Sequence, residues 1–310
     1  MSCQAYLIEP TRFELPMLES TTAVDPEPYW APATTYALGA KVVYTASPTS
    51  GYFAGVSMLR VFQSLVAGNT SPTTNATHWQ DAGPANSVAM FTTKRAEKTT
   101  ATGPLEVVLD VDDLVTAAAF FGLRGEEMTL IVRREDTTIR SSRVVDLIDR
   151  SQVTNWLEFF FVERRDKETI VFLDLDAIPG DTIEVSVTGP ATECARMIFG
   201  RPTPIGETQM GATWEMDNYT ATDPDEFGFV DPVTRDYAPR QNITLLSARA
   251  ATNTVINTLV DLRGTPCVLV ASQDRYLANA LVNFGLVREP TIAIQLPAHN
   301  LVTFEFKGFV

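Results

Sequence analysis

Few residues in this sequence could act as a nucleophile or a base. The chain has two histidines, His78 and His299, so a Ser-His-Asp or Cys-His site would need one of them beside a nucleophile. The sequence contains neither a Gly-x-Ser-x-Gly elbow nor an HExxH motif. His78 adjoins Trp79 within a run of turn-forming residues, and His299 precedes the last predicted strand. We therefore expect structural roles for both histidines.

Three groups of acids could supply the paired carboxylates, about 5 to 10 Å apart, that a glycosidase needs. The groups are Asp110/Asp112/Asp113, Asp174/Asp176/Asp181 and Asp223/Asp225/Glu226/Asp231. None of them matches the Asp-Gly-x-Asp-x-Asp-x-Glu run of chitinases, and clusters of acids at strand ends are usually solvated. We predict that the protein has no catalytic residue and is not an enzyme.

The segment Asp223–Gly228 looks superficially like a calcium loop. Phe227 offers no oxygen ligand, and Thr234 stands where the bidentate Glu of an EF-hand belongs. An irregular cation site among these acids remains an alternative. The sequence has no GxxxxGK loop and no GxGxxG after a strand. We predict no metal and no cofactor.

Charge and composition narrow the choice of partners. The 310 residues carry a net charge of −14, from 38 acidic and 24 basic side chains, which repels nucleic acid and anionic membranes. No apolar run approaches the roughly 18 residues of a membrane span, and residues 1–10 do not form a secretory signal. Cys3, Cys194 and Cys267 lack CxxC spacing and are expected to be buried apolar residues. We expect synthesis in the cytoplasm, no nucleic-acid partner and no membrane span.

Aromatic residues, glycines and prolines are concentrated between residues 29 and 84. Short alternating runs, Lys41–Tyr44 and Arg60–Leu65, predict strands, and the glycines and prolines between them predict turns. A module of about 55 residues buries little apolar area, so a few large aromatic rings can supply most of its core. Four of the aromatics could also stack on the apolar face of a sugar: Trp30, Tyr36, Tyr52 and Trp79.

This spacing resembles the small chitin-binding module of chitinases, which also occurs in altered form on bacteriophage tail proteins. The matching residues are Trp30, Tyr36, Gly39, Val42, Tyr44, Gly51, Tyr52, Gly68, Pro72 and Trp79. The following Gly83-Pro84, Asn86 and Ala89-Met90-Phe91 resemble a junction found in phage tail and baseplate-fibre proteins. The end of the chain is similar to the end of those proteins, at Ser247, Arg249, Leu262-Arg263-Gly264, Pro266 and Leu301–Gly308.

Apolar periodicity predicts mainly strands after this module. The predicted strands of a central β-sandwich are Leu105–Val111, Met128–Arg133, a buried Trp156–Val162, Thr169–Leu175 and Asp181–Thr188. Val115–Phe121 fits either a short helix or a strand. The C-terminal elements are a strand at Asn242–Leu246, a helix at Ala250–Leu262, and strands at Cys267–Ala271, Leu281–Val287, Thr291–Leu296 and Leu301–Lys307. We expect Gly264 to cap the helix in a left-handed conformation.

The sequence thus predicts a mainly β protein with a small aromatic-rich β module, a central antiparallel β-sandwich and a C-terminal mixed α+β domain. The predicted divisions are a lead segment (1–27), the chitin-binding-module-like unit (28–91), the sandwich (92–200), an extended connector (201–240) and the C-terminal domain (241–310). Tyr6–Ile8, Phe13–Leu15 and Thr92–Pro104 are expected to offer strands to neighbouring copies.

The resemblance implies a non-enzymatic structural protein of a phage virion, made in the host cytoplasm and placed at the tail tip or baseplate, where it links the tail to its fibres. Its expected partners are other tail, baseplate and fibre proteins, and its own copies in a trimer or hexamer. One alternative is an adsorption protein that binds a host surface glycan. A second is an accessory of a carbohydrate-active enzyme.

Overall fold

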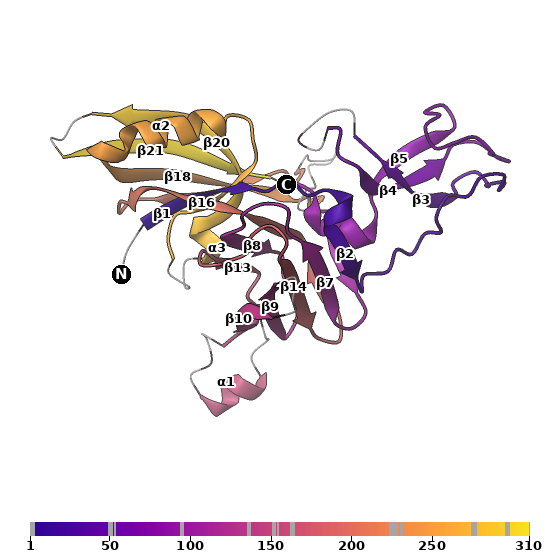
Figure 1. The fold of residues 1–310 in the computed structure, drawn as a ribbon, viewed down its shortest axis with the longest axis horizontal. Helices are drawn as coiled ribbons and strands as arrows, with labels where there is room; N and C mark the ends of the chain where they lie inside the picture. The colour runs from indigo at the N-terminus through magenta and orange to yellow at the C-terminus, as the bar shows by residue number, and fades with distance from the viewer. Residues whose placement is uncertain are drawn as a thin grey trace.

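The computed structural model describes residues 4–48, 52, 54–93, 96–134, 138–150, 153, 155–161, 165–222, 229, 232–273, 278–294 and 298–309. Over these residues the protein is mainly β, as predicted, with several antiparallel sheets and little helix (Figure 1). An aromatic-rich β module, an antiparallel β-sandwich and a C-terminal α+β part occur in that order along the chain.

Three sheets contain most of the strands. The large sheet pairs, in this order, β13 (Thr169–Phe172), β8 (Ala117–Phe121), β16 (Arg196–Thr208), β1 (Gln4–Pro10), β19 (Cys267–Val270), β20 (Val282–Ala293), β21 (His299–Gly308), β18 (Tyr237–Ala248) and β17 (Thr213–Asn218). The second sheet pairs β10 (Ile139–Asp146), β9 (Glu127–Arg133), β14 (Thr182–Thr188), β7 (Leu105–Asp110) and β2 (Leu18–Thr21). The module sheet pairs β3 (Lys41–Ala46), β4 (Met58–Ser64) and β5 (Trp79–Pro84).

The remaining elements are short. Two small ladders pair β11 (Ile148–Asp149) with β12 (Arg165–Asp166) and β6 (Thr99–Ala101) with β15 (Thr192–Cys194). The α-helices are α1 (Trp156–Phe161), α2 (Thr252–Asp261) and α3 (Ala278–Leu281), and the 3-10 turns are η1 (Leu15–Met17), η2 (Asn86–Phe91) and η3 (Arg249–Ala251).

The second sheet packs on one end of the large sheet to form the sandwich. Along β14 the side chains of Ile183, Val185 and Val187 are buried in alternation, as predicted. On the facing layer, Ala118 and Phe120 of β8 belong to the same apolar cluster. The run Val115–Phe121, which the sequence left open, is therefore a strand over most of its length.

The other end of the large sheet closes on itself. In the described part of the chain, β16, β1, β19, β20, β21 and β18 form a six-stranded antiparallel barrel, because β16 also pairs with β18 through Glu207 and Thr208. Gly206, at a φ of 141°, permits this closure, since a Cβ there would lie 2.8 Å from the carbonyl oxygen of Leu246. Closure leaves no free edge among these six strands.

Helix α2 covers the barrel core, as the predicted helical spacing requires. Val255, Leu259 and Leu262 join an apolar cluster that contains Leu7 and Phe304 of the barrel strands. Beyond the helix, Gly264 has a φ of 75°, so the predicted left-handed glycine at this helix end is confirmed.

The segment 1–27 is not a peripheral lead in its described part. β1 lies between β16 and β19, with Leu7 in the barrel core and Ile8 in a third apolar cluster with β8 and β19. Its backbone is therefore paired on both sides, and it cannot donate a strand to another copy. Residues 13–15 form no strand, and β6 is paired with β15. The strand-addition sites predicted at Tyr6–Ile8 and Phe13–Leu15 were wrong, and strand addition at Thr92–Pro104 stays a prediction, because β6 has a strand on one side only.

The predicted connector also proves to be strand. β16 continues through Thr208, β17 follows, and β18 begins at Tyr237, so an extended connector over 201–240 was wrong for the described residues. β16 belongs to the sandwich at Met197 and to the barrel at Ile205. One long strand thus joins two units that the sequence separated at residue 200.

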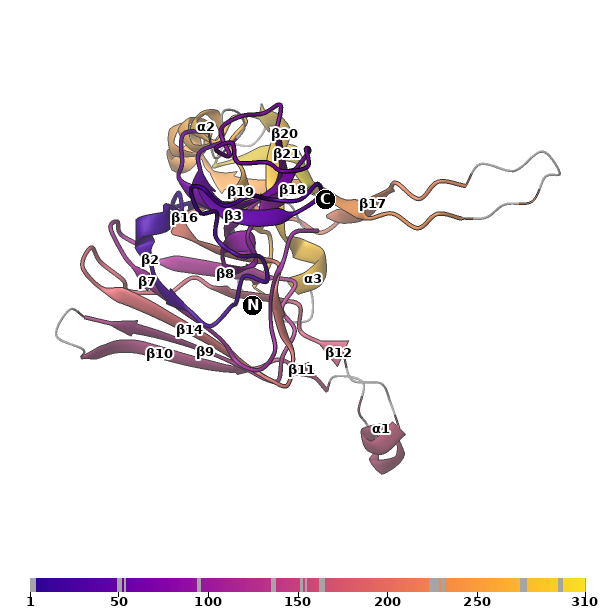
Figure 2. The same ribbon diagram turned by 90° about the vertical axis from the view of Figure 1, so that its right-hand side faces the viewer.

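Two projections leave this body (Figure 2). One begins at the β11–β12 ladder and carries α1. The other is the ribbon in which Thr213–Asn218 of β17 pairs with Tyr237–Asn242 of β18, with a further bridge between Ala221 and Val233. Figure 2 shows both on the same side of the molecule.

We expect Leu7→Ala to lower the free energy of unfolding by about 2–5 kcal/mol, because it opens a cavity in the barrel core. Urea unfolding of the full chain measures this change. Val24→Ala is the matched control, since Val24 is 76% exposed in the same N-terminal segment and its loss should change stability by less than about 0.5 kcal/mol. Equal effects of the two substitutions would contradict the placement of β1.

Candidate interaction surfaces

The aromatic module positions its rings by a turn network around β4. The buried amide of Asn69 donates to Ser64 Oγ at 3.0 Å and to the carbonyl of His78 at 3.1 Å. His78 Nδ1 lies 2.6 Å from Ser71 Oγ. The histidine thus belongs to a hydrogen-bonded turn, in agreement with the role expected for it.

Trp79 is a core residue of this module. It is 2% exposed, its Nε1 donates to the carbonyl of Ser71 at 2.9 Å, and its ring lies edge-to-face with Tyr36 at 5.4 Å between centroids. The stacking role predicted for Trp79 needs an open indole face. Because that face is covered, the assignment of Trp79 to a sugar platform is corrected.

The other three predicted sugar-binding rings are half-buried. Trp30 packs edge-to-face on Tyr44 at 5.6 Å, and the Tyr36 hydroxyl accepts the Ala31 N–H at 2.8 Å. Burial raises the pKa of the Tyr52 hydroxyl. Sugar binding stays a prediction for Trp30, Tyr36 and Tyr52.

The module shares its core with the rest of the protein. Val43, Met58 and Val61 belong to the same apolar cluster as the sandwich residues, and Phe13 stacks on Phe91 at 3.9 Å. Arg12 donates to the carbonyls of residues 52 and 54 at 3.1 and 2.5 Å. These contacts anchor the module on the sandwich.

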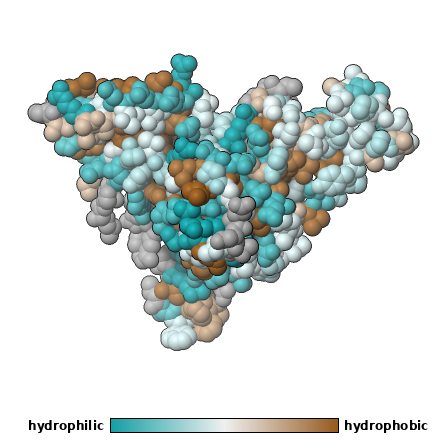
Figure 3. All heavy atoms as spheres, viewed as in Figure 1, coloured by the Kyte–Doolittle hydropathy of each residue, from teal (hydrophilic) through white to brown (hydrophobic). Residues whose placement is uncertain are grey.

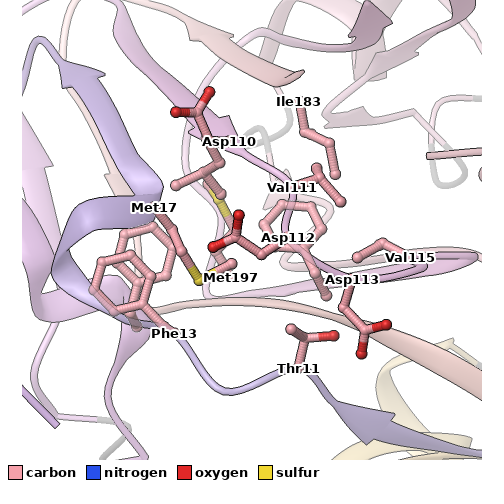
Figure 4. Close-up of a pocket in the computed structure, with 13 residues that line it drawn as sticks. Thr11, Phe13, Met17, Asp110, Val111, Asp112, Asp113, Val115, Ile183 and Met197 are labelled. Carbon is pink, nitrogen blue, oxygen red and sulfur yellow. The ribbon is translucent and has the colours of Figure 1, made fainter. Parts of the chain in front are cut away.

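The first predicted group of acids lies at a small apolar cavity (Figure 4). Its volume is about 30 Å³, which is room for water and not for a sugar. Figure 4 shows the carboxylates of Asp110, Asp112 and Asp113 pointing in different directions. Asp113 pairs with Arg201, and a hydrogen bond from the Leu114 N–H is the main cause that lowers the pKa of Asp113.

The second group of acids holds the edge strand β10. Arg140 pairs with Asp176 at 2.9 Å and with the buried Asp181 at 3.2 Å, while Arg143 pairs with Asp174 at 2.6 Å. Each carboxylate thus has an arginine partner. A carboxylate that acted as a general acid or base would first have to give up this ion pair.

Some of the predicted residues lie outside the described residues: Cys3, Gly51, Asp223, Asp225, Glu226, Phe227 and Asp231. Within the described part, no three His, Cys, Asp or Glu side chains are grouped to hold a metal ion. His299 is the exposed first residue of β21, and Cys194 and Cys267 are buried, as predicted.

The most prominent apolar surface was missed from the sequence. Trp156–Val162 was predicted as a buried strand, but residues 156–161 form α1 at the end of a projection. The exposed fractions are 78% for Trp156, 69% for Leu157, 48% for Phe159, 68% for Phe160 and 80% for Phe161. Figure 3 shows brown and tan atoms at the lower tip, where α1 lies in Figure 1. An apolar run this short does not distinguish strand from helix.

The β17–β18 ribbon carries a second exposed apolar surface. Trp214 and Met216 are 44% and 48% exposed, and the Trp214 ring lies 6.5 Å from that of Tyr237. The opposite face is ionic, with Glu215 paired to Arg240 and Asp217 to Lys307. Alternation of Trp214 and Met216 with acids in the sequence is the signal that could have identified this surface.

Comparisons of the chain with protein-family models, with curated proteins and with solved structures found no match. None of the helices in the described residues has the length and apolar character needed to cross a membrane.

We expect Trp79→Ala to lower the free energy of unfolding by about 3–5 kcal/mol, because it removes a buried ring. Leu38→Ala is the control in the same module, since Leu38 is 66% exposed. Denaturant unfolding followed by fluorescence compares the two. A Trp79→Ala protein as stable as wild type would show that the ring is not part of the core.

The buried thiols predict slow labelling. Burial raises the pKa of both Cys194 and Cys267 to about 12, so at about pH 8 the thiolate fraction is on the order of one in ten thousand. In a Cys3→Ser background, a thiol reagent should label the folded chain at least about 100-fold more slowly than the unfolded chain. Since the unfolded thiols ionise near their ordinary value of 9.0, their contribution to stability is full below that pH and is lost as pH rises toward 12. Rapid labelling of the folded chain would contradict this burial.

Proposed function

We propose that this protein is a non-enzymatic structural component of a phage virion tail, which acts at the tail tip or baseplate through protein–protein contacts and links the tail to its fibres. The observation that carries the contact role is α1, whose large apolar side chains project into solvent. Proteins that work alone rarely expose such a patch, because each uncovered apolar side chain forgoes burial.

The virion placement is supported by the sequence resemblance of three separate segments to phage tail proteins. These segments are the aromatic module, the Gly83–Phe91 junction and the C-terminal stretch ending at Gly308. In the proposed role the sandwich and barrel act as one stiff spacer, because β16 runs through both. Synthesis in the host cytoplasm and incorporation into the virion belong to the same proposal.

A second candidate is adsorption to a host surface glycan through the aromatic module. The observation that favours it is Tyr29, 61% exposed and adjacent to the half-buried Trp30. Pyranose rings stack on open aromatic faces, and several weak sites on one particle multiply their affinity.

The structural role predicts that cryo-electron microscopy of particles containing this chain will place it at the tail tip or baseplate, with α1 covered by a neighbouring subunit. Phe160→Asp, which removes apolar contact area, should lower its incorporation at least about tenfold. Leu38→Asp is the matched control, because it adds the same charge at an exposed apolar position in the module.

Three results would contradict the proposal. The chain could be missing from purified particles. It could turn over chitin or a bacterial polysaccharide in a manner abolished by a substitution such as Asp176→Asn. It could bind a glycan array in a manner lost with Trp30→Ala while folding stays intact, which would favour the adsorption candidate.

A further inference from the structure

Two apolar surfaces of this chain have no cover within the described residues. We call Trp156, Leu157, Phe159, Phe160 and Phe161 the aromatic helix, and Trp214 with Met216 the ribbon face. The rings of the aromatic helix contact one another, with centroids of Trp156 and Phe160 at 6.1 Å and of Phe159 and Phe160 at 5.3 Å. These contacts hold the cluster together but leave its outer surface in water.

The aromatic helix is apolar on more than one side. Trp156, Phe159 and Phe160 lie three and four residues apart and share one side of the helix, while Leu157 and Phe161 share another. A helix with large apolar side chains on two sides is normally covered by more than one neighbour.

The ribbon face offers a flat apolar surface against which the aromatic helix can pack. Trp214 and Met216 alternate with Glu215 and Asp217, so one side of the ribbon is apolar and the other is held in ion pairs with Arg240 and Lys307. At Trp214, β17 is the edge strand of the large sheet, because Gln241 of β18 pairs with Trp214 on one side and with Phe306 of β21 on the other.

The combined area is enough for a stable interface when two copies make both contacts with each other. If each aromatic ring buries about 150–250 Å² when covered, the exposed fractions of the two surfaces correspond to on the order of 1,000 Å² per copy. Stable protein interfaces bury about 800 Å² per partner. Because both projections leave the same side of the body, a second copy placed on that side can meet both.

We propose that the aromatic helix of one copy packs against the ribbon face of a second copy. This inference rests on the proposed structural function and names the surface through which copies of the chain join. Each copy then offers one donor and one acceptor surface, and in a reciprocal dimer both contacts form between the same two copies. An exposed aromatic helix could instead bind an anionic lipid surface. The net charge of −14 opposes that binding, because like charges repel.

Sedimentation analysis of the full chain tests the contact. We expect wild type to associate, and Phe160→Asp and Met216→Asp each to raise the dissociation constant at least about tenfold. The double variant should lose little more than either single variant, because both act on one contact. Leu38→Asp, at an exposed apolar site of the module, should associate like wild type. Unchanged circular dichroism of each variant excludes unfolding as the cause.

Cross-linking identifies which surfaces meet. In a Cys3→Ser background, where Cys194 and Cys267 are buried, a short bismaleimide should join a Phe160→Cys chain to a Met216→Cys chain in a mixture. Neither variant should give a covalent dimer alone. Dimers from Phe160→Cys alone would show helix-to-helix contact and overturn the proposal.

Two further results would also overturn it. A wild-type chain that stays monomeric, and binds vesicles of anionic lipid, would assign the aromatic helix to a membrane surface. An oligomer indifferent to both aspartate variants would mean that copies join through another face, and in that case the structural function itself would stand. Only absence of the chain from virus particles would remove the structural function as well.

Discussion

The pairing of β1 with both β16 and β19 is the constraint on which the rest of the structure depends. It places a segment from the start of the chain between strands from its middle and its end, and without it the barrel would be open between those two strands. Leu7 then fills the barrel while Ile8 on the opposite face packs toward β8. Because one strand contributes to two apolar clusters, the sandwich and the barrel cannot separate without exposing both.

The shared apolar core also explains how the small module is stabilised. A unit of its size buries little apolar surface alone, and its strands β3 and β4 extend the cluster of the sandwich. Its large rings serve this packing first, as the enclosed Trp79 shows. The side chains free to meet a partner lie instead on the two projections. The inference that the protein works by contact therefore depends on elements outside the aromatic module.

Local patterns predicted local structure well. Alternation in β7, β9 and β14, the helical spacing of Val255, Leu259 and Leu262, and the glycine after α2 all have their causes within a few residues. The failures have non-local causes. Nothing near Leu7 indicates that its strand is central, because its partners, Thr203 and Leu269, lie far away in the sequence. An apolar run such as 156–161 normally signals burial, and only the three-dimensional position of its projection reveals the opposite.

Non-local contacts also decide the roles of the candidate site residues. Arginines of β10 hold Asp174, Asp176 and Asp181, and Asp181 is buried rather than solvated as expected. Trp79 could not be assigned from its type, because a tryptophan serves equally as core or platform, and burial decides between them.

The location of β1 has a consequence for biosynthesis. The ribosome makes this strand before both of the strands that pair with it, β16 and then β19. The nascent chain must therefore carry this strand with its backbone groups unpaired until β16 is made, and the barrel cannot close before β19 has followed. Such late, long-range pairing makes folding slow and sensitive to crowding by other nascent chains, so chaperone supply would limit the yield of the native protein.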